Sequence, residues 1–204
     1  MNYYIADTHF GHENIMRHCN RPFATVAEMD RIMLDNINSA VTDHDDLYIL
    51  GDFCHWNQKI VYPSDYLSKM NGHKHFILGN HDRNIPHDKY AARYLEEITA
   101  YKEIKDNGRK VVLSHFPIAE WNGYHTGTLH IHGHIHNNFE LPVFAYMGSL
   151  ENCYNVGVDV IGFTPRTLDE LIVMREQGLL YGESQRERNK EEFLDQSEEE
   201  EFER

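Results

Sequence analysis

Cysteine is scarce in this sequence, which contains only Cys19, Cys54 and Cys153 in 204 residues. Three cysteines are too few and too scattered for a disulfide framework, and they form no C-x-x-C pair for zinc. We therefore expect three reduced and mostly buried thiols in a cytosolic protein.

Long apolar runs are also missing from the sequence. No run approaches the ~18 apolar residues that a membrane-spanning helix needs. The first residues show no basic region followed by a long apolar stretch, so no signal peptide is predicted. These two absences predict a cytoplasmic protein that makes no contact with a membrane.

Positive charge is the third shortage, because 33 acidic residues outnumber 19 Lys and Arg and give a net charge of −14. Residues 183–204 hold ten acids and four bases, so they contribute −6 and the rest of the chain contributes −8. We expect one domain over residues 1–182 and an acidic tail over 183–204 that is disordered or a frayed helix. The acidic body disfavours a nucleic-acid partner, but bound cations would still admit a small phosphoester or nucleotide-like substrate.

Short apolar runs alternate with helical patterns in the first half of the chain. The runs end at Gly, Asp, Asn or polar residues, and we interpret them as buried strands at 3–6, 47–50, 75–78, 111–113, 129–132 and 156–158. Capping boxes at Thr25 and Thr167 predict helices there, Ser64 predicts a short helix, and 86–98 is a further candidate. This order indicates an α/β domain, with later strands, from about residue 111, that look like a meander or hairpins.

Histidine is abundant, with fifteen in 204 residues, and metal-ligating residue types follow five of the predicted strands. Taken singly, each of these endings is weak, because a D-x-H is more often a surface feature and a Gly-Asp is usually a turn. All five together favour one site, since functional groups gather beyond the carboxyl ends of strands. The endings are Asp7-Thr8-His9, Gly51-Asp52, Gly79-Asn80-His81-Asp82, Ser114-His115 and Gly133-His134-Ile135-His136.

The chemistry of these endings suits divalent cations. Two carboxylates, four imidazoles and one amide oxygen are harder ligands than thiolates, and this set suits Mn²⁺, Fe, Zn²⁺, Co²⁺ or Ni²⁺. Glycines at 51, 79 and 133 would let the backbone approach the ions closely.

The order of these motifs resembles that of the calcineurin-like metallophosphoesterase superfamily, over about two thirds of the chain. Residues 7–15 and 155–159 are similar to a subgroup of small, single-domain predicted phosphoesterases. The resemblance implies a four-layer αββα sandwich, in which two sheets are flanked by helices. It also implies two divalent metal ions, most simply manganese, and hydrolysis by a metal-bridged hydroxide in line with the departing oxygen.

Residue roles follow from the resemblance. It implies that Asp52 bridges the ions, that His81 assists the leaving group and that Asp82 orients His81. One ion would be bound by Asp7, His9 and His136, and the other by Asn80, His115 and His134.

Several further residues could have more than one role. His12, Arg21 and Arg17 could contact a substrate phosphate, and His55 could contact the site directly, although solvent-facing or structural roles are common for such residues. Asp159 is either a turn residue or a partner behind the ligands. His130 and His132 would support their strand or the ligands. Surface positions are expected for His73, His75, His87 and His125.

The leading functional hypothesis is a phosphodiesterase or phosphatase that acts on a small phosphoester. A metal-dependent nuclease is the alternative within the same chemistry. A binding module without catalysis and a histidine-rich metal-storage protein are alternatives of other classes. The natural substrate, the native metals and the oligomeric state stay open.

Overall fold

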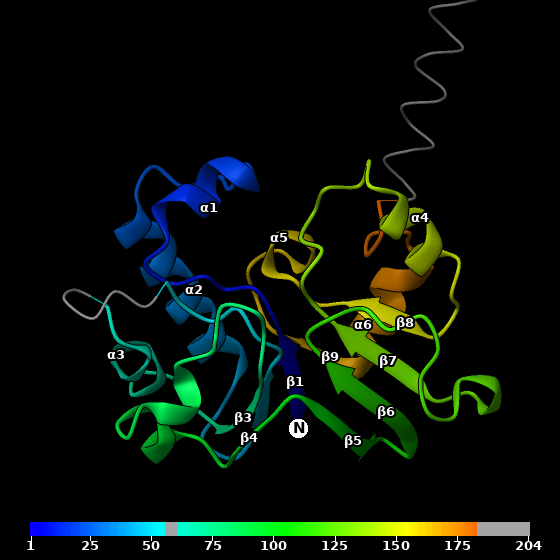
Figure 1. The fold of residues 1–204 in the computed structure, drawn as a ribbon, viewed down its shortest axis with the longest axis horizontal. Helices are drawn as coiled ribbons and strands as arrows, with labels where there is room; N and C mark the ends of the chain where they lie inside the picture. The colour runs from blue at the N-terminus through cyan, green and yellow to red at the C-terminus, as the bar shows by residue number, and fades with distance from the viewer. Residues whose placement is uncertain (56–60, 183–204) are drawn as a thin grey trace, which may run out of the picture.

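The computed structural model describes residues 1–55 and 61–182, which form two β-sheets flanked by helices (Figure 1). The order of the five-stranded sheet is β4-β3-β2-β1-β9, and that of the four-stranded sheet is β5-β6-β7-β8. Helices α2 and α3 accompany the first sheet and α4 lies beside the second, whereas α6 contacts both, through β9 and β1 of the first sheet and β8 of the second. The predicted two-sheet sandwich is confirmed, whereas the predicted tail at 183–204 lies outside the described residues.

Most of the first sheet is parallel. Its parallel strands are β1 (Asn2–Ile5), β2 (Asp46–Ile49), β3 (His73–Ile77) and β4 (Glu97–Thr99), and β9 (Arg166–Thr167) pairs antiparallel with β1. The side chains of β1 and β2 are almost continuously buried, as expected where both faces of a sheet are covered. The carboxyl ends of β1, β2 and β3 therefore meet at one edge.

The second sheet corrects part of the sequence prediction. Strands β5 (Tyr101–Asp106) and β6 (Arg109–Ser114) form a hairpin, but β6, β7 (Leu129–His132) and β8 (Cys153–Asn155) run parallel. The predicted meander is thus wrong beyond the first hairpin. The connections through η3 (Tyr124–Thr126) and α4 (Pro142–Gly148) are each more than a dozen residues long, which is enough for parallel crossovers.

The two sheets meet at the end of β1. The amide of Ala6 donates to the carbonyl of Val156 at 2.9 Å, and the amide of Val158 donates to the carbonyl of Ala6 at 3.0 Å. The strand predicted at 156–158 is therefore wrong, because this segment makes only a bridge to Ala6 before α5 (Val158–Ile161) begins. A second link joins the sheets where the Tyr4 hydroxyl donates to Asp106 at 2.7 Å.

The helices with strong local signals form as predicted. In α2 (Val26–Ala40), the Thr25 side chain caps the helix by accepting from the amide of Glu28, and the buried face carries Met29, Met33 and Ile37. Thr167 and Glu170 form the capping box of α6 (Leu168–Glu176). Helix α3 (Pro63–Leu67) begins one residue before Ser64, with proline in its first turn.

The helix predicted over 86–98 does not form. The chain instead makes two 3₁₀ turns, η1 (Ile85–His87) and η2 (Ala91–Tyr94), and then enters β4. Asp88 interrupts the helical pattern, because its carboxylate accepts from the amides of Tyr90 and Ala91 at 2.8 and 3.2 Å. The short helix α1 (Glu13–His18) was not predicted.

The expected burial of the thiols is confirmed, since Cys19, Cys54 and Cys153 are all buried and unpaired. Within 1–55 and 61–182, no helix combines the length and the apolar character that crossing a membrane requires.

Candidate metal centre

The five predicted strand endings converge on one place between the sheets. Three follow β1, β2 and β3 of the first sheet, and two follow β6 and β7 of the second. Each set belongs to parallel strands, so their carboxyl ends face the same region. The fold thus brings residues separated by up to 129 positions into one cluster.

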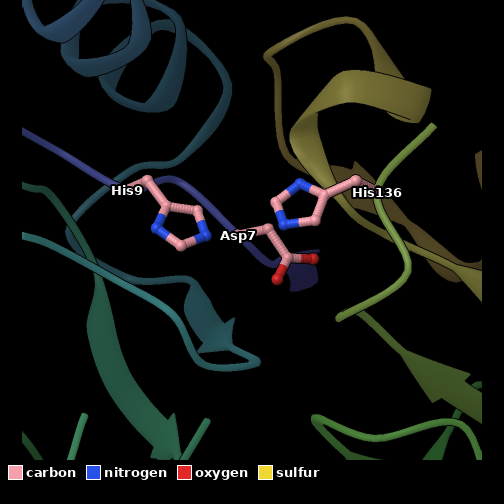
Figure 2. A group of neighbouring side chains, drawn as sticks. All are labelled: Asp7, His9 and His136. Atoms are coloured by element: carbon pink, nitrogen blue, oxygen red, sulfur yellow. The ribbon is translucent and has the colours of Figure 1, made fainter. Parts of the chain in front are cut away.

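Asp7, His9 and His136 form the first ligand group, and their ligand atoms all lie within 4.8 Å of one another. Figure 2 shows the two imidazole rings on either side of the Asp7 side chain. Asp7 is completely buried, and neither its Oδ1 nor Nε2 of His9 has a hydrogen-bond partner. Buried polar atoms without partners are costly, and a cation between them would remove that cost.

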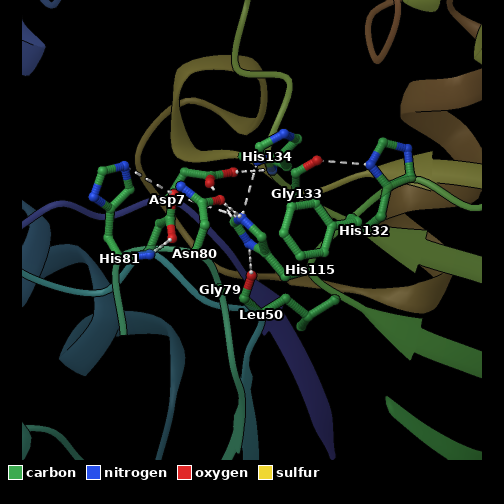
Figure 3. A network of polar contacts seen from close by, with 12 residues as sticks. Asp7, Leu50, Gly79, Asn80, His81, His115, His132, Gly133 and His134 are labelled. Atoms are coloured by element: carbon green, nitrogen blue, oxygen red, sulfur yellow. Dashed lines mark hydrogen bonds and ion pairs between the residues drawn. The ribbon is translucent and has the colours of Figure 1, made fainter. Parts of the chain in front are cut away.

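Asp52, His115 and His134 form the second group, again within 4.8 Å. Figure 3 shows the Asn80 side chain next to His115 and His134. Nε2 of His115 lies 3.0 Å from Oδ1 of Asn80 and 3.2 Å from Nδ1 of His134. Nδ1 of His115 donates to the carbonyl of Leu50 at 2.8 Å. The lone pair of Nε2 is therefore directed at the cluster.

The Asp52 carboxylate lies between the two groups. Its Oδ2 is 3.7 Å from Nε2 of His9 and 3.5 Å from Nε2 of His115. A carboxylate in this position is able to contact a cation in either group.

His136 is fixed from behind by Asp159. Its Nδ1 donates to Asp159 at 2.8 Å, so Nε2 is left for the cluster. Asp159 also binds the guanidinium of Arg21 at 2.7 Å, and both side chains are fully buried. The sequence left the role of Asp159 open, and the structure shows it as the partner of a ligand-type histidine.

Arg21 is not placed to clamp a substrate, which corrects one sequence expectation. Besides Asp159, its guanidinium donates to the carbonyls of Asp7 and Thr8, both at 2.8 Å. These bonds occupy it on the inner side of the cluster, away from solvent.

Asp82 does not orient His81, which corrects a second expectation. Its buried carboxylate accepts from the backbone amides of Asp52, Phe53 and Gly79 at 2.6, 3.0 and 2.8 Å. Asp82 therefore ties the loop after β2 to the loop after β3.

His81 lies at the open side of the cluster, with 58% of its side chain exposed. Its backbone amide donates to Oδ1 of Asp52 at 2.9 Å, and its Nε2 is 4.0 Å from Oδ2 of the same carboxylate. The imidazole thus projects into the space above the cluster from a fixed backbone.

His12 also reaches this opening. Its ring stacks on His55 with centroids 4.5 Å apart, and its buried Nδ1 has no partner. Burial and the neighbouring His55 lower the pKa of His12 to about 4, so its imidazole is neutral near pH 7.

The remaining histidines divide into buried and surface positions. His132 bonds to the carbonyl of Gly133 and to the Tyr181 hydroxyl, and His130 is also fully buried. His73, His87 and His125 are exposed as expected. His75 is not a simple surface residue, because it binds both Asp46 and Glu97 and stacks on Tyr48.

The backbone of the cluster is strained. Among the described residues, eight other than glycine have positive φ, with values from 46° to 74°, and five of these are ligand-type residues. Such conformations are uncommon and concentrate where the surrounding structure over-determines a functional geometry. The five are Asp7, His9, Asp52, His134 and His136.

The predicted glycines allow close approach. A Cβ on Gly133 would lie 2.6 Å from Oδ2 of Asp7, and one on Gly79 would lie 2.6 Å from the amide of Asp52. One on Gly51 would lie 2.7 Å from Nδ1 of His115. Each contact is closer than real Cβ atoms tolerate, so these positions require glycine.

The pKa shifts of the first group describe its metal-free state. Burial raises the pKa of Asp7 to about 6, despite the opposing effect of His136 and His115. Burial and His136 hold the pKa of His9 far below its usual range. Burial would lower the pKa of His136 as well, but its bond to Asp159 raises it to about 11, so without a metal its Nε2 carries a proton that a bound cation would replace. The orphaned buried atoms belong to the first group, and the hard oxygen and nitrogen donors of both groups suit divalent ions.

Three features of the site gave no usable sequence signal. Phe116, next to His115, packs its ring against His115 and His134. Cys19 places its sulfur near His136 and Asp159. Helix α1 supplies a wall of the cavity above the cluster. The position of each feature in the site depends on contacts between distant segments, so no local sequence pattern predicts it.

Comparisons with known proteins find relatives that match most of this chain. No family model matches the sequence. The chain is 35% identical over 176 residues to the uncharacterized protein MJ1445 of Methanocaldococcus jannaschii, covering 86% of this chain and 92% of that protein. It is 27% identical over 185 residues to the Gene 66 protein of Mycobacterium phage L5, covering 78% and 87%. The protein of unknown function AQ665 from Aquifex aeolicus superposes with a TM-score of 0.66 at 30% identity, covering 83% of this chain and 96% of that one.

The two-sheet architecture and the convergence of the ordered motifs agree with the fold that the resemblance to calcineurin-like metallophosphoesterases implies. The chain belongs to the family of MJ1445.

Proposed function

We propose that this protein is a metal-dependent phosphoester hydrolase with a dinuclear centre. The observation that carries the proposal is a pair of neighbouring groups of ligand-type residues with the Asp52 carboxylate between them, 3.7 Å from Nε2 of His9 and 3.5 Å from Nε2 of His115. Asp52 would contact both ions, and manganese is the first metal to test. One ion would be held by Asp7, His9 and His136, and the other by Asn80, His115 and His134.

The chemistry needs a nucleophile, charge neutralisation and a proton donor. When bound, two divalent ions supply an activated water and neutralise charge on the phosphoryl oxygens. In the net reaction, water adds to phosphorus, the P–O bond to the leaving group breaks, and the departing oxygen gains a proton. His81 is the group of this chain that can donate that proton, because its exposed imidazole lies beside the Asp52 carboxylate.

The Asp52→Asn variant tests the shared carboxylate. We expect the wild type, stripped with chelator and reloaded with Mn²⁺, to hold two ions per chain and to hydrolyse phenyl 4-nitrophenyl phosphate. Asp52→Asn should lose both properties, because an amide is a weaker and neutral ligand. Elemental analysis counts the metal, and the released nitrophenolate reports turnover.

Asp35→Asn is the matched control, since Asp35 is exposed and, among the described residues, forms its ion pair with Arg31 of the same helix, α2. A normal metal count and full activity in Asp52→Asn would refute the shared-ligand role. Two ions per chain without turnover, repeated with Ni²⁺, Zn²⁺ and Fe²⁺, would favour a binding module.

The His81→Ala variant tests the proton donor. We expect a normal metal count, a small rate loss with 4-nitrophenol as leaving group, and a loss of ~10²–10⁴-fold with a methanol leaving group. The difference arises because a poor leaving group depends on protonation, whereas nitrophenolate departs without it. An equal loss for both leaving groups would exclude His81 as the acid.

A further inference from the structure

A cavity of about 830 Å³ opens directly above the ligand cluster. One part is lined by histidines of the cluster, including His9, His81 and His134. The other part is apolar and is lined by Ile15 of α1, by Phe116 and by Leu141, which precedes α4. Figure 1 shows α1 at the upper left and α4 at the upper right, and residues of both helices line the cavity. The site is thus polar at the reacting centre and apolar beside it.

Phe116 is the most unusual part of this wall. It is 47% exposed, although its ring centroid lies only 4.7 Å from that of His134 and 5.0 Å from that of His115. Both contacts are edge-on, at interplanar angles of 63° and 78°, so they leave ring surface uncovered. The Ser114 hydroxyl donates to the carbonyl of Phe116 at 2.6 Å and fixes the backbone.

The charge of the cavity limits what it can hold. Its described lining contains no lysine or arginine. Arg21 is turned inward and fully buried. Side chains that could neutralise additional phosphate groups are therefore missing from this wall, and the acidic body adds no long-range attraction for a polyanion.

The proton donor and the apolar wall contact different parts of the cluster. His81 lies beside His9, with ring centroids 5.5 Å apart, whereas Phe116 packs on His115 and His134. A phosphoryl group at the cluster would therefore direct one ester oxygen toward His81 and another substituent toward Phe116.

We infer that the site takes phosphodiesters with a single phosphoryl group, whose retained ester substituent is a flat, uncharged ring that stacks on Phe116. The departing oxygen then faces His81. The inference rests on the proposed hydrolase function and names the substrate class of that site. A nucleic-acid strand carries a negative charge at every phosphate, and the described lining of the cavity has no lysine or arginine to neutralise these charges.

The test uses two diesters that share a leaving group, phenyl 4-nitrophenyl phosphate and methyl 4-nitrophenyl phosphate. We expect kcat/KM to favour the phenyl diester by about tenfold, in the range of aromatic stacking. Phe116→Ala should reduce this ratio to about one. Tyr146→Ala is the matched control, because Tyr146 is an exposed aromatic residue of α4 outside the described cavity lining. That variant should keep the ratio.

Calorimetric binding of diphenyl phosphate and dimethyl phosphate to the Mn²⁺-loaded protein gives a second readout. Tighter binding of the diphenyl ester, lost in Phe116→Ala, supports the inference even if neither diester turns over, an outcome that would contradict the hydrolase proposal alone. Equal kcat/KM and equal binding for both pairs would overturn the inference while leaving hydrolysis intact. Faster cleavage of single-stranded DNA than of either diester would also overturn it, in favour of a nuclease.

Discussion

The guanidinium of Arg21 connects two parts of the candidate metal centre. It donates to the carbonyls of Asp7 and Thr8, and it pairs with Asp159, which accepts from Nδ1 of His136. Asp7 has a φ of 58°, in a region that costs roughly 1–3 kcal/mol for residues other than glycine. The planar fork of arginine satisfies these acceptors together and so opposes relaxation of the strained loop.

Replacing Arg21 with lysine tests this connection. A lysine keeps the charge but is unable to reach all three acceptors in the same geometry. We expect Arg21→Lys to weaken metal binding by ~10–100-fold, as is typical when a group that orients ligands is changed. Competition against a fluorescent chelator measures the affinity.

Arg17→Lys is the control for Arg21→Lys. Arg17 belongs to α1 and is exposed, and its recorded bond is to Asn14 in the same helix. Wild-type affinity is expected for this variant. If Arg21→Lys binds metal as tightly as Arg17→Lys, the buried guanidinium does not support the ligands.

At the scale of elements, the sequence predicts what is local and misses what depends on distant partners. The helix after Thr25 was predictable because its cap and its apolar face lie within fifteen residues. The ligand-type residues were predictable because each follows a buried strand, and parallel strands end at a common edge. No local signal shows that Arg21 meets Asp159, 138 positions away.

Each incorrect prediction has a specific physical cause. The pattern at 86–98 has helical spacing, but the Asp88 side chain captures amides that a continuous helix would bond to its own carbonyls. The segment 156–158 is apolar like a strand, yet only its contact with Ala6 is strand-like. For Asp82, the family resemblance implied that it orients His81, whereas the turn after Gly79 directs the carboxylate to three backbone amides.

At the scale of the whole molecule, the second sheet contains a titratable group at its centre. His130 is fully buried on β7, where its Nδ1 donates to the carbonyl of Val112 and its Nε2 accepts from the amide of Ile118, both at 3.2 Å. This pair of bonds requires the neutral imidazole, because a protonated ring would have no acceptor nitrogen. Burial accordingly lowers the pKa of His130 from 6.5 to about 4.

The stability of the metal-free protein should therefore depend on pH through His130. Between pH 6.5 and 4, His130 binds a proton in the unfolded chain but stays neutral in the folded chain. The free energy of unfolding therefore falls as pH falls through this window. The contribution is complete above pH 6.5, and its loss amounts to as much as about 3 kcal/mol, at 1.36 kcal/mol per pKa unit.

Urea unfolding at pH 7, 5.5 and 4.5 measures this contribution in the wild type and in His130→Gln, whose side chain does not titrate. His125→Gln serves as the control, since His125 is 77% exposed and should leave the slope unchanged. We expect a shallower dependence on pH in His130→Gln alone, and an unchanged slope there would mean that the acid sensitivity of the fold originates elsewhere.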